Sequence, residues 1–180
     1  MSQRLIYVMD PMCSWCWGFA PVIDAITEAY PLLPLRLVAG GLRANHGAPL
    51  DEHTRAVLAL VVARELDQAK VWPFVRAVQQ AFYIDVEDVT HAAVLVALAE
   101  SVGYPPAEFG ELFDQQKTRE MTLADVAWVA DLGMAGLPIL LAEREGQLAL
   151  LANGCQPADQ VLGLLARWVE AGQKAGVVTA

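Results

Sequence analysis

Apolar residues near the start of the chain follow a pattern typical of strands on either side of a helix. The run Arg4–Met9 is apolar after its first residue, as in a strand covered on both faces. Leu35–Ala39 predicts a second strand. Residues 15–30 between them are predicted to form a helix. Pro21 should bend or break this helix, because an interior proline removes a hydrogen bond.

The middle of the chain, from Leu50 to Leu132, has helical periodicity. Thr90 is predicted to cap a helix that runs to Gly103, and Phe109 lies in a further short helix. Residues 122–125 have the form of a capping box and should open the last helix of this block. One predicted helical face carries these apolar residues: Val71, Phe74, Val75, Val78 and Phe82.

Strand-like patterns return in the last part of the chain. Residues 138–142 and 147–152 are apolar runs around the polar segment 143–146, which predicts a hairpin. Pro157 occupies a position suited to the first residue of a helix, and this helix is expected to end at Gly172.

The predicted order is strand, helix, strand, a block of helices, hairpin and helix. It corresponds to an α/β, thioredoxin-like fold with an all-helical insertion between its two halves. Residues 1–49 would form the first half, 50–133 the insertion and 134–180 the second half. A length of 180 residues suits one domain of this kind.

Composition restricts the location and the partners of the protein. No apolar run approaches the roughly 18 residues of a membrane span. The apolar segment near the start, five residues before Asp10, is too short for a signal peptide. We therefore expect a cytoplasmic protein without a membrane partner. The net charge of −9 argues against nucleic acid, because phosphate binding needs a basic surface. Three cysteines in such a chain indicate a redox or catalytic pair rather than a structural disulfide framework.

Cys13 and Cys16 have the spacing of a redox pair and lie between a predicted strand and a helix N-terminus. Unpaired N–H groups and the helix dipole favour a thiolate there. We expect Cys13 to be exposed and reactive, with Cys16 more buried and able to resolve a mixed disulfide. Zinc binding and an inert pair are the alternatives. Zinc needs four ligands, and the three histidines, His46, His53 and His91, are scattered.

Other residues near the pair have competing interpretations. Of Trp15 and Trp17, one is expected in the core and the other as a groove wall beside Cys13. Asp10 is expected to cap the strand end, and if close to Cys13 it would oppose thiolate formation. Cys155 is expected to be a small buried hydrophobe, with a regulatory or third redox role as the alternative.

The stretch Asp10-Pro11-Met12-Cys13-Ser14-Trp15-Cys16-Trp17-Gly18 resembles the active-site motif of DsbA-type thiol–disulfide oxidoreductases, most closely their FrnE-like cytoplasmic branch. Residues 40–43, 80–83 and 136–138 occur in the expected order, so the resemblance covers nearly the whole chain. The segment after residue 52 departs from the family, because the helical insertion is shorter than in its relatives.

The resemblance implies roles for individual residues. Cys13 would be the nucleophile, Cys16 the resolving thiol and Pro138 a cis-proline that faces them. The expected substrate-binding residues are Met12, Trp15, Trp17 and Leu137. A strand that begins with proline after a glycine-containing loop is also a suitable place for a cis bond.

The expected function is thiol–disulfide exchange with protein or small-thiol substrates. No cofactor or metal is expected, although glutathione or another low-molecular-weight thiol could be the redox partner. Two alternatives stay open: a glutathione-dependent isomerase or transferase of the kappa-class type, whose members typically carry serine at the nucleophile position, and a non-catalytic chaperone-like binding protein. The dipeptide Ser14-Trp15 contains no cation, so we expect an intermediate Cys13 pKa and a potential nearer the reducing end.

Overall fold

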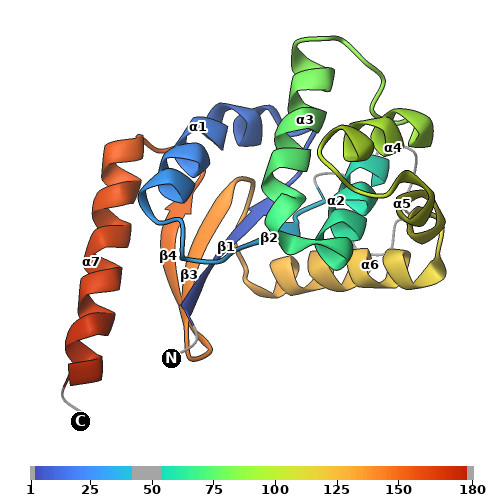
Figure 1. Ribbon diagram of the computed structural model, residues 1–180. Coiled ribbons are helices and arrows are strands. Elements are labelled where there is room, and N and C mark those ends of the chain that lie inside the picture. Colours follow the sequence, from blue (N-terminus) through green and yellow to red (C-terminus); the bar gives the residue numbers. More distant parts are fainter. Residues whose placement is uncertain (1–2, 42–53, 178–180) are drawn as a thin grey trace.

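The fold is built around a four-stranded sheet in the order β2-β1-β3-β4. The computed structural model describes residues 3–41 and 54–177, with side chains to residue 174 (Figure 1). The strands are β1 (Gln3–Met9), β2 (Leu35–Ala39), β3 (Ile139–Arg144) and β4 (Gln147–Asn153). β1 pairs parallel with β2 and antiparallel with β3, so the first and last parts of the chain share one sheet.

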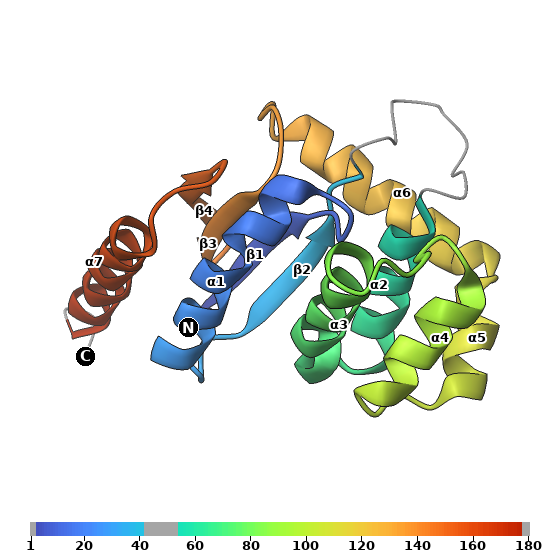
Figure 2. The same cartoon turned by 90° about the horizontal axis from the view of Figure 1, so that it is seen from above.

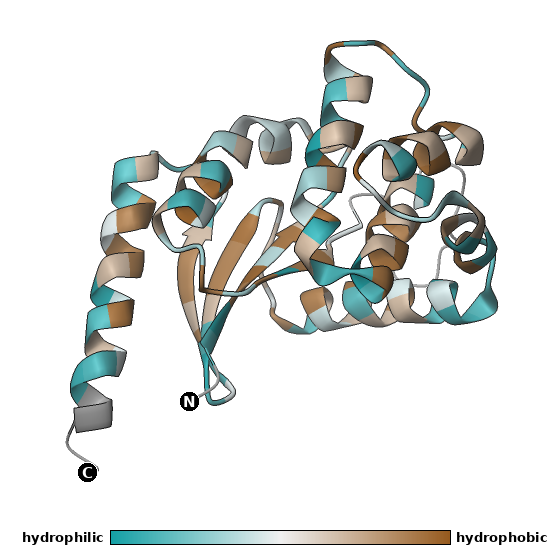
Figure 3. Cartoon of the chain, viewed as in Figure 1, coloured by the Kyte–Doolittle hydropathy of each residue, from teal (hydrophilic) through white to brown (hydrophobic). Residues whose placement is uncertain are grey.

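Helices cover both faces of this sheet. α1 (Ser14–Ala29) and α6 (Gln116–Asp131) lie on opposite sides in Figure 2, and α7 (Ala158–Val177) packs on β4 and α1. The side chains of β1 alternate accordingly. Tyr7 belongs to the main core with residues of α1, whereas Val8 belongs to a smaller cluster with Val129 of α6. The strands are accordingly largely hydrophobic along most of their length (Figure 3).

The helical insertion stands beside the β2 edge of the sheet (Figure 1). It contains α2 (Arg55–Leu66), a 3₁₀ turn at Gln68–Lys70, α3 (Val71–Tyr83), α4 (Ala92–Ser101), α5 (Pro106–Phe113) and α6. All residues from Ala56 to Ala63 are buried, so α2 is its central helix. The predicted apolar face of α3 is confirmed, with its members buried except for Phe82, which is half-buried.

Several predicted helix ends are wrong. α4 begins at Ala92, and the Thr90 hydroxyl instead donates to Asp88 Oδ1 (2.6 Å). Thr122 lies inside α6, where its hydroxyl donates to the Thr118 carbonyl (2.8 Å), a back-bond open to threonine in a helix interior. α7 passes Gly172 and ends at Val177, and α1 continues through Pro21 as one helix.

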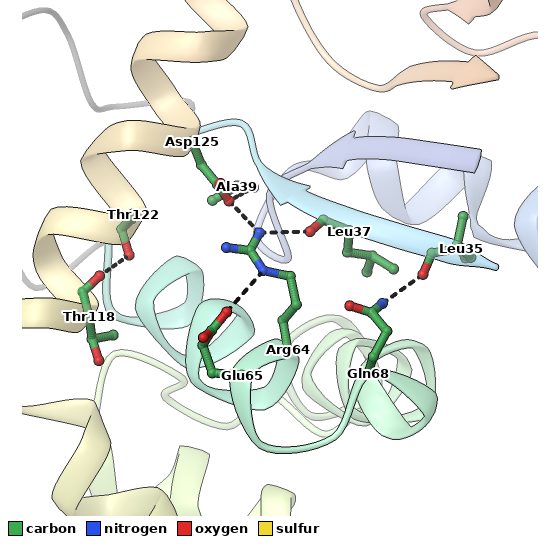
Figure 4. A network of polar contacts seen from close by, with 9 residues as sticks. All are labelled: Leu35, Leu37, Ala39, Arg64, Glu65, Gln68, Thr118, Thr122 and Asp125. Carbon is green, nitrogen blue, oxygen red and sulfur yellow. Dashed lines mark hydrogen bonds and ion pairs between the residues drawn. The ribbon is translucent and has the colours of Figure 1, made fainter. Parts of the chain in front are cut away.

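Side chains of the insertion form hydrogen bonds with backbone groups on the outer edge of β2 (Figure 4). Arg64 Nη1 donates to the Leu37 carbonyl (2.9 Å) and to Asp125 Oδ2 (2.6 Å). The same Asp125 oxygen accepts the Ala39 N–H (2.9 Å), and Gln68 donates to the Leu35 carbonyl (2.7 Å). The backbone groups that another strand would pair with are therefore occupied by α2, the 3₁₀ turn and α6.

Candidate redox-active site

The cysteine motif connects the end of β1 to the start of α1. Asp10 accepts the Met12 N–H on Oδ1 (2.9 Å) and the Cys13 N–H on its carbonyl (3.0 Å), which fixes a tight turn after the strand. Cys13 is the N-cap residue of α1, and Cys16 lies in its first turn. The predicted placement at a helix N-terminus, and the capping role of Asp10, are confirmed.

Both thiols are buried. Cys13 is 3% exposed and Cys16 is fully enclosed, so the expectation of an exposed Cys13 is wrong. The reason is that Cys13 belongs to the main hydrophobic core, against which Met12 and Leu137 pack. Leu137 comes from a distant part of the chain, and the local helix geometry does not reveal it.

The pKa values of the two cysteines are shifted in opposite directions. The pKa of Cys13 is lowered to about 6, chiefly by a hydrogen bond from the Cys16 thiol and further by backbone contacts with Cys16 and Trp15; burial and the charge of Asp10 oppose this. The pKa of Cys16 is raised by the same hydrogen bond and by burial. A Cys13 thiolate beside a protonated Cys16 is thus the reduced form expected at neutral pH.

The loop before β3 packs beside the motif. The Leu137–Pro138 peptide bond is cis, and the Pro138 carbonyl accepts the Gly154 N–H (2.8 Å). A Cβ on Gly40 would lie only 2.7 Å from Leu137 Cδ2. The Gly40 N–H donates to the carbonyl of Met9, the last residue of β1. Leu137 therefore lies near the end of β1, from which the motif continues.

The tryptophans of the motif lie at the surface. Trp15 is 66% exposed and Trp17 is 36% exposed, so the expectation that one of them is in the core is wrong. Trp17 stacks on Tyr83 of α3, with ring centroids 4.8 Å apart and planes 18° apart. The Tyr83 hydroxyl donates to the Met12 carbonyl (2.8 Å). The insertion therefore supplies an aromatic side chain that contacts the motif both before Cys13 and after Cys16.

Cys155 is exposed, which contradicts the expectation of a buried hydrophobe. Its thiol donates to the Trp15 carbonyl (3.0 Å). After β4 the chain turns at Gly154, which has a positive φ of 83°, and this turn brings Cys155 to the N-terminal end of α1. Burial of part of the thiol and the nearby Cys13 raise the pKa of Cys155, so it is a weaker nucleophile than Cys13 at neutral pH.

Sequence reasoning missed two tyrosines, Tyr7 and Tyr83. Tyr7 is fully buried in β1, and its hydroxyl lies 3.4 Å from the Cys16 carbonyl, to which it donates. Strand alternation gives its face of the sheet but not its contact with the motif. For Tyr83 the available signal was the segment 80–83, which fits the family resemblance without indicating a contact.

Metal-binding clusters and membrane-spanning helices are both absent from the described part of the chain. Within it, no group of three or more His, Cys, Asp or Glu side chains is arranged to hold a metal ion. His91 is exposed, and its Nδ1 lies 3.0 Å from Asp88 Oδ2. His46 and His53 fall outside the described residues. None of the helices in residues 3–41 and 54–177 has the length and hydrophobicity to cross a bilayer.

Comparison with known proteins gives a family match over most of the chain. Residues 4–166 match the family model of the DSBA-like thioredoxin domain. A "putative protein disulfide isomerase" from Nitrosomonas europaea has a TM-score of 0.81 and 29% identity, over 95% of this chain and 99% of that one. The cytosolic disulfide reductase DsbM from Pseudomonas aeruginosa has a TM-score of 0.73 and 24% identity, over 92% and 98%. A DsbM structure with GSH has a TM-score of 0.69 and 22% identity, over the same shares. No curated protein matches.

Proposed function

This chain belongs to the DsbA-like thioredoxin domain family, and we propose that it catalyses thiol–disulfide exchange through Cys13 and Cys16. The observation that carries the proposal is the unequal pair itself. One sulfur has a pKa of about 6 and is ionised at neutral pH, while its neighbour keeps its proton. This is the division of roles that a nucleophile and a resolving thiol require.

The proposed reaction has two steps. The Cys13 thiolate attacks one sulfur of a substrate disulfide, forms a mixed disulfide and releases the other sulfur as a thiolate. Cys16 then attacks the Cys13 sulfur, the mixed disulfide breaks, and the second substrate sulfur leaves with the proton that Cys16 gives up. Two electrons pass from the cysteine pair to the substrate, which becomes two thiols.

We further propose that the protein works as a disulfide reductase in the cytoplasm, with glutathione or a similar small thiol as partner or substrate. The Cys13 pKa of about 6 supports this direction, because it lies well above the value of ~3.5 in the strongly oxidising DsbA. The similarity to DsbM, described as cytosolic and also determined with GSH, supports the location and the thiol. Met12, Trp15, Trp17 and Leu137 are the proposed contact residues, with Pro138 opposite the thiols.

The test is reduction of glutathione disulfide by the pre-reduced protein, followed as glutathione release. Wild type should release two glutathione molecules per pair and end as the Cys13–Cys16 disulfide. Cys13→Ser should release none, and Cys16→Ser should stop after one and retain the other on Cys13. Full activity in Cys13→Ser would refute the proposal. Glutathione-dependent isomerisation without disulfide formation would indicate the kappa-class alternative, and substrate binding without thiol release a chaperone-like protein.

A further inference from the structure

Tyr7 holds a phenol against the resolving cysteine from inside the sheet. Its side chain is fully buried, between Phe19 (ring centroids 6.0 Å apart) and Trp72 (5.9 Å). Its hydroxyl donates to the Cys16 carbonyl across 3.4 Å, so it lies beside the residue whose thiol attacks in the resolving step. The two aromatic neighbours, one from α1 and one from α3, leave the ring little freedom to move its hydroxyl away.

This phenol can only donate a hydrogen bond at neutral pH. Burial raises the pKa of Tyr7 above its ordinary value of about 10, and the negative charges of nearby thiolates raise it further. Tyr7 therefore stays protonated throughout the reaction and cannot act as the base that deprotonates Cys16.

A donor beside Cys16 is needed at one particular stage. While the pair is free, the Cys16 thiol donates to the Cys13 thiolate. Once Cys13 is joined to a substrate it no longer carries a charge, and the negative charge must develop on Cys16 in a fully enclosed position. An unpaired charge in such surroundings is unfavourable unless a donor faces it.

We propose that the Tyr7 hydroxyl turns its proton from the Cys16 carbonyl to the Cys16 sulfur as that sulfur attacks, and so accelerates the resolving step while leaving the first step unaffected. The inference rests on the proposed function. In this step the bond between Cys13 and the substrate sulfur breaks, the Cys13–Cys16 bond forms, and the proton of Cys16 ends on the leaving substrate thiol. Tyr7 keeps its own proton. Hydrogen bonds to charged groups are typically worth enough to change a rate roughly 10- to 100-fold.

The test compares Tyr7→Phe with wild type, both carrying Cys155→Ser so that glutathione can be assigned to Cys13. Reduced protein is mixed with glutathione disulfide, quenched in acid at increasing times, and weighed by mass spectrometry. Tyr7→Phe should form the mixed disulfide at the wild-type rate and close it roughly 10- to 100-fold more slowly, so the mixed disulfide accumulates. Tyr104→Phe is the matched control, since it removes another buried hydroxyl, one that donates to the Asp67 carbonyl (2.9 Å). This control should leave both steps unchanged.

A pH series separates the proposed role from a merely structural one. Charges on Asp10 and Cys13 also raise the pKa of Cys16. Cys155, which influences Tyr7, is removed by the Cys155→Ser substitution in every variant. Removing the donor should move the midpoint of the resolving step to higher pH, while an Asp10→Asn variant should move it to lower pH. If Tyr7→Phe does not fold, the otherwise unchanged protein can be made with fluorotyrosine in place of tyrosine. Fluorinated phenols are stronger hydrogen-bond donors, so the resolving step should then be faster.

Resolution in Tyr7→Phe at the wild-type rate and midpoint would overturn the inference, as would equal slowing of both steps or no acceleration by fluorination. Failure of the proposed function would look different, because the wild-type protein itself would then form no mixed disulfide.

Discussion

The neighbouring Cys16 thiol affects the ionisation of Cys13 more than the backbone groups of the helix end do. The Cys16 thiol is the largest cause of the lowered Cys13 pKa, ahead of the backbone contacts at the helix end. This agrees with the small energy that helix ends usually supply, about 0.3–1 kcal/mol. The identity of the residue three positions after Cys13 therefore matters more for its ionisation than the helix does.

Alkylation of Cys13 should follow this pKa. In a Cys155→Ser background, the rate with iodoacetamide should rise with pH through a midpoint near 6, because the thiolate is the reacting species. Cys16→Ala removes the main donor and should move the midpoint toward the ordinary thiol value of about 8.5. A midpoint near 6 in Cys16→Ala would instead assign the effect to the backbone groups.

At this scale the sequence predicted the cysteine pair and the capping role of Asp10, but not the surroundings of the pair. The missing contacts come from residues distant in the chain: Leu137 packs against the core to which Cys13 belongs, Tyr83 stacks on Trp17, and the Cys155 thiol donates to the Trp15 carbonyl. Each depends on how separate elements pack, which local spacing does not contain.

The junction between α2, α6 and β2 joins the helical insertion to the sheet. Arg64 and Asp125 have side chains that are each 8% exposed and lie 2.6 Å apart. Both also bond the backbone of β2, so the pair is an ionic contact and an edge cover at once.

Breaking this pair should destabilise the protein strongly. Asp125→Ala leaves the Arg64 guanidinium and the Ala39 N–H without their shared acceptor, and should lower the free energy of unfolding in urea by about 3–5 kcal/mol. Asp131→Ala, an exposed position on the same helix, should change it by less than about 0.5 kcal/mol. The double variant Arg64→Met, Asp125→Leu should lose less than the sum of its single changes. Strict additivity would mean that the two residues act independently.

Most elements were predictable from apolar periodicity, whereas their ends and junctions were not. The strands and the apolar face of α3 have repeated patterns along several residues. The supposed capping box at Thr122 is a four-residue pattern equally compatible with a helix interior, and the partners Arg64 and Asp125 lie in different helices. Short polar patterns and pairings across elements are therefore where the predictions fail or say nothing.

For the whole molecule, ionisation of Cys13 links redox state to stability. Its pKa is about 6 in the folded protein and about 8.5 when unfolded, so the stabilisation is complete above pH 8.5 and lost as pH falls toward 6. The difference in unfolding free energy between reduced wild type and Cys13→Ser should grow across this window, by on the order of 3 kcal/mol. Cys16 opposes this trend only above about pH 8.5, where the unfolded thiol ionises.

Urea unfolding under reducing conditions at several pH values between about 5.5 and 8.5 measures this difference. The oxidised protein lacks both thiols and is the internal control, because its stability should not contain this pH-dependent part. A constant difference across the window would mean that Cys13 ionises alike in the folded and unfolded chains.

The position of β1 in the sheet has a consequence for synthesis of the chain. One neighbour of β1 is β2, which is made soon after it, but the other neighbour, β3, begins only at Ile139. At ~5–20 residues per second, the ribosome needs roughly 6–24 s to add the residues between Trp17 and Leu137. Throughout that interval the nascent cysteine pair lacks β3 and the loop before it, so the compartment in which translation takes place, rather than the finished fold, sets its first oxidation state.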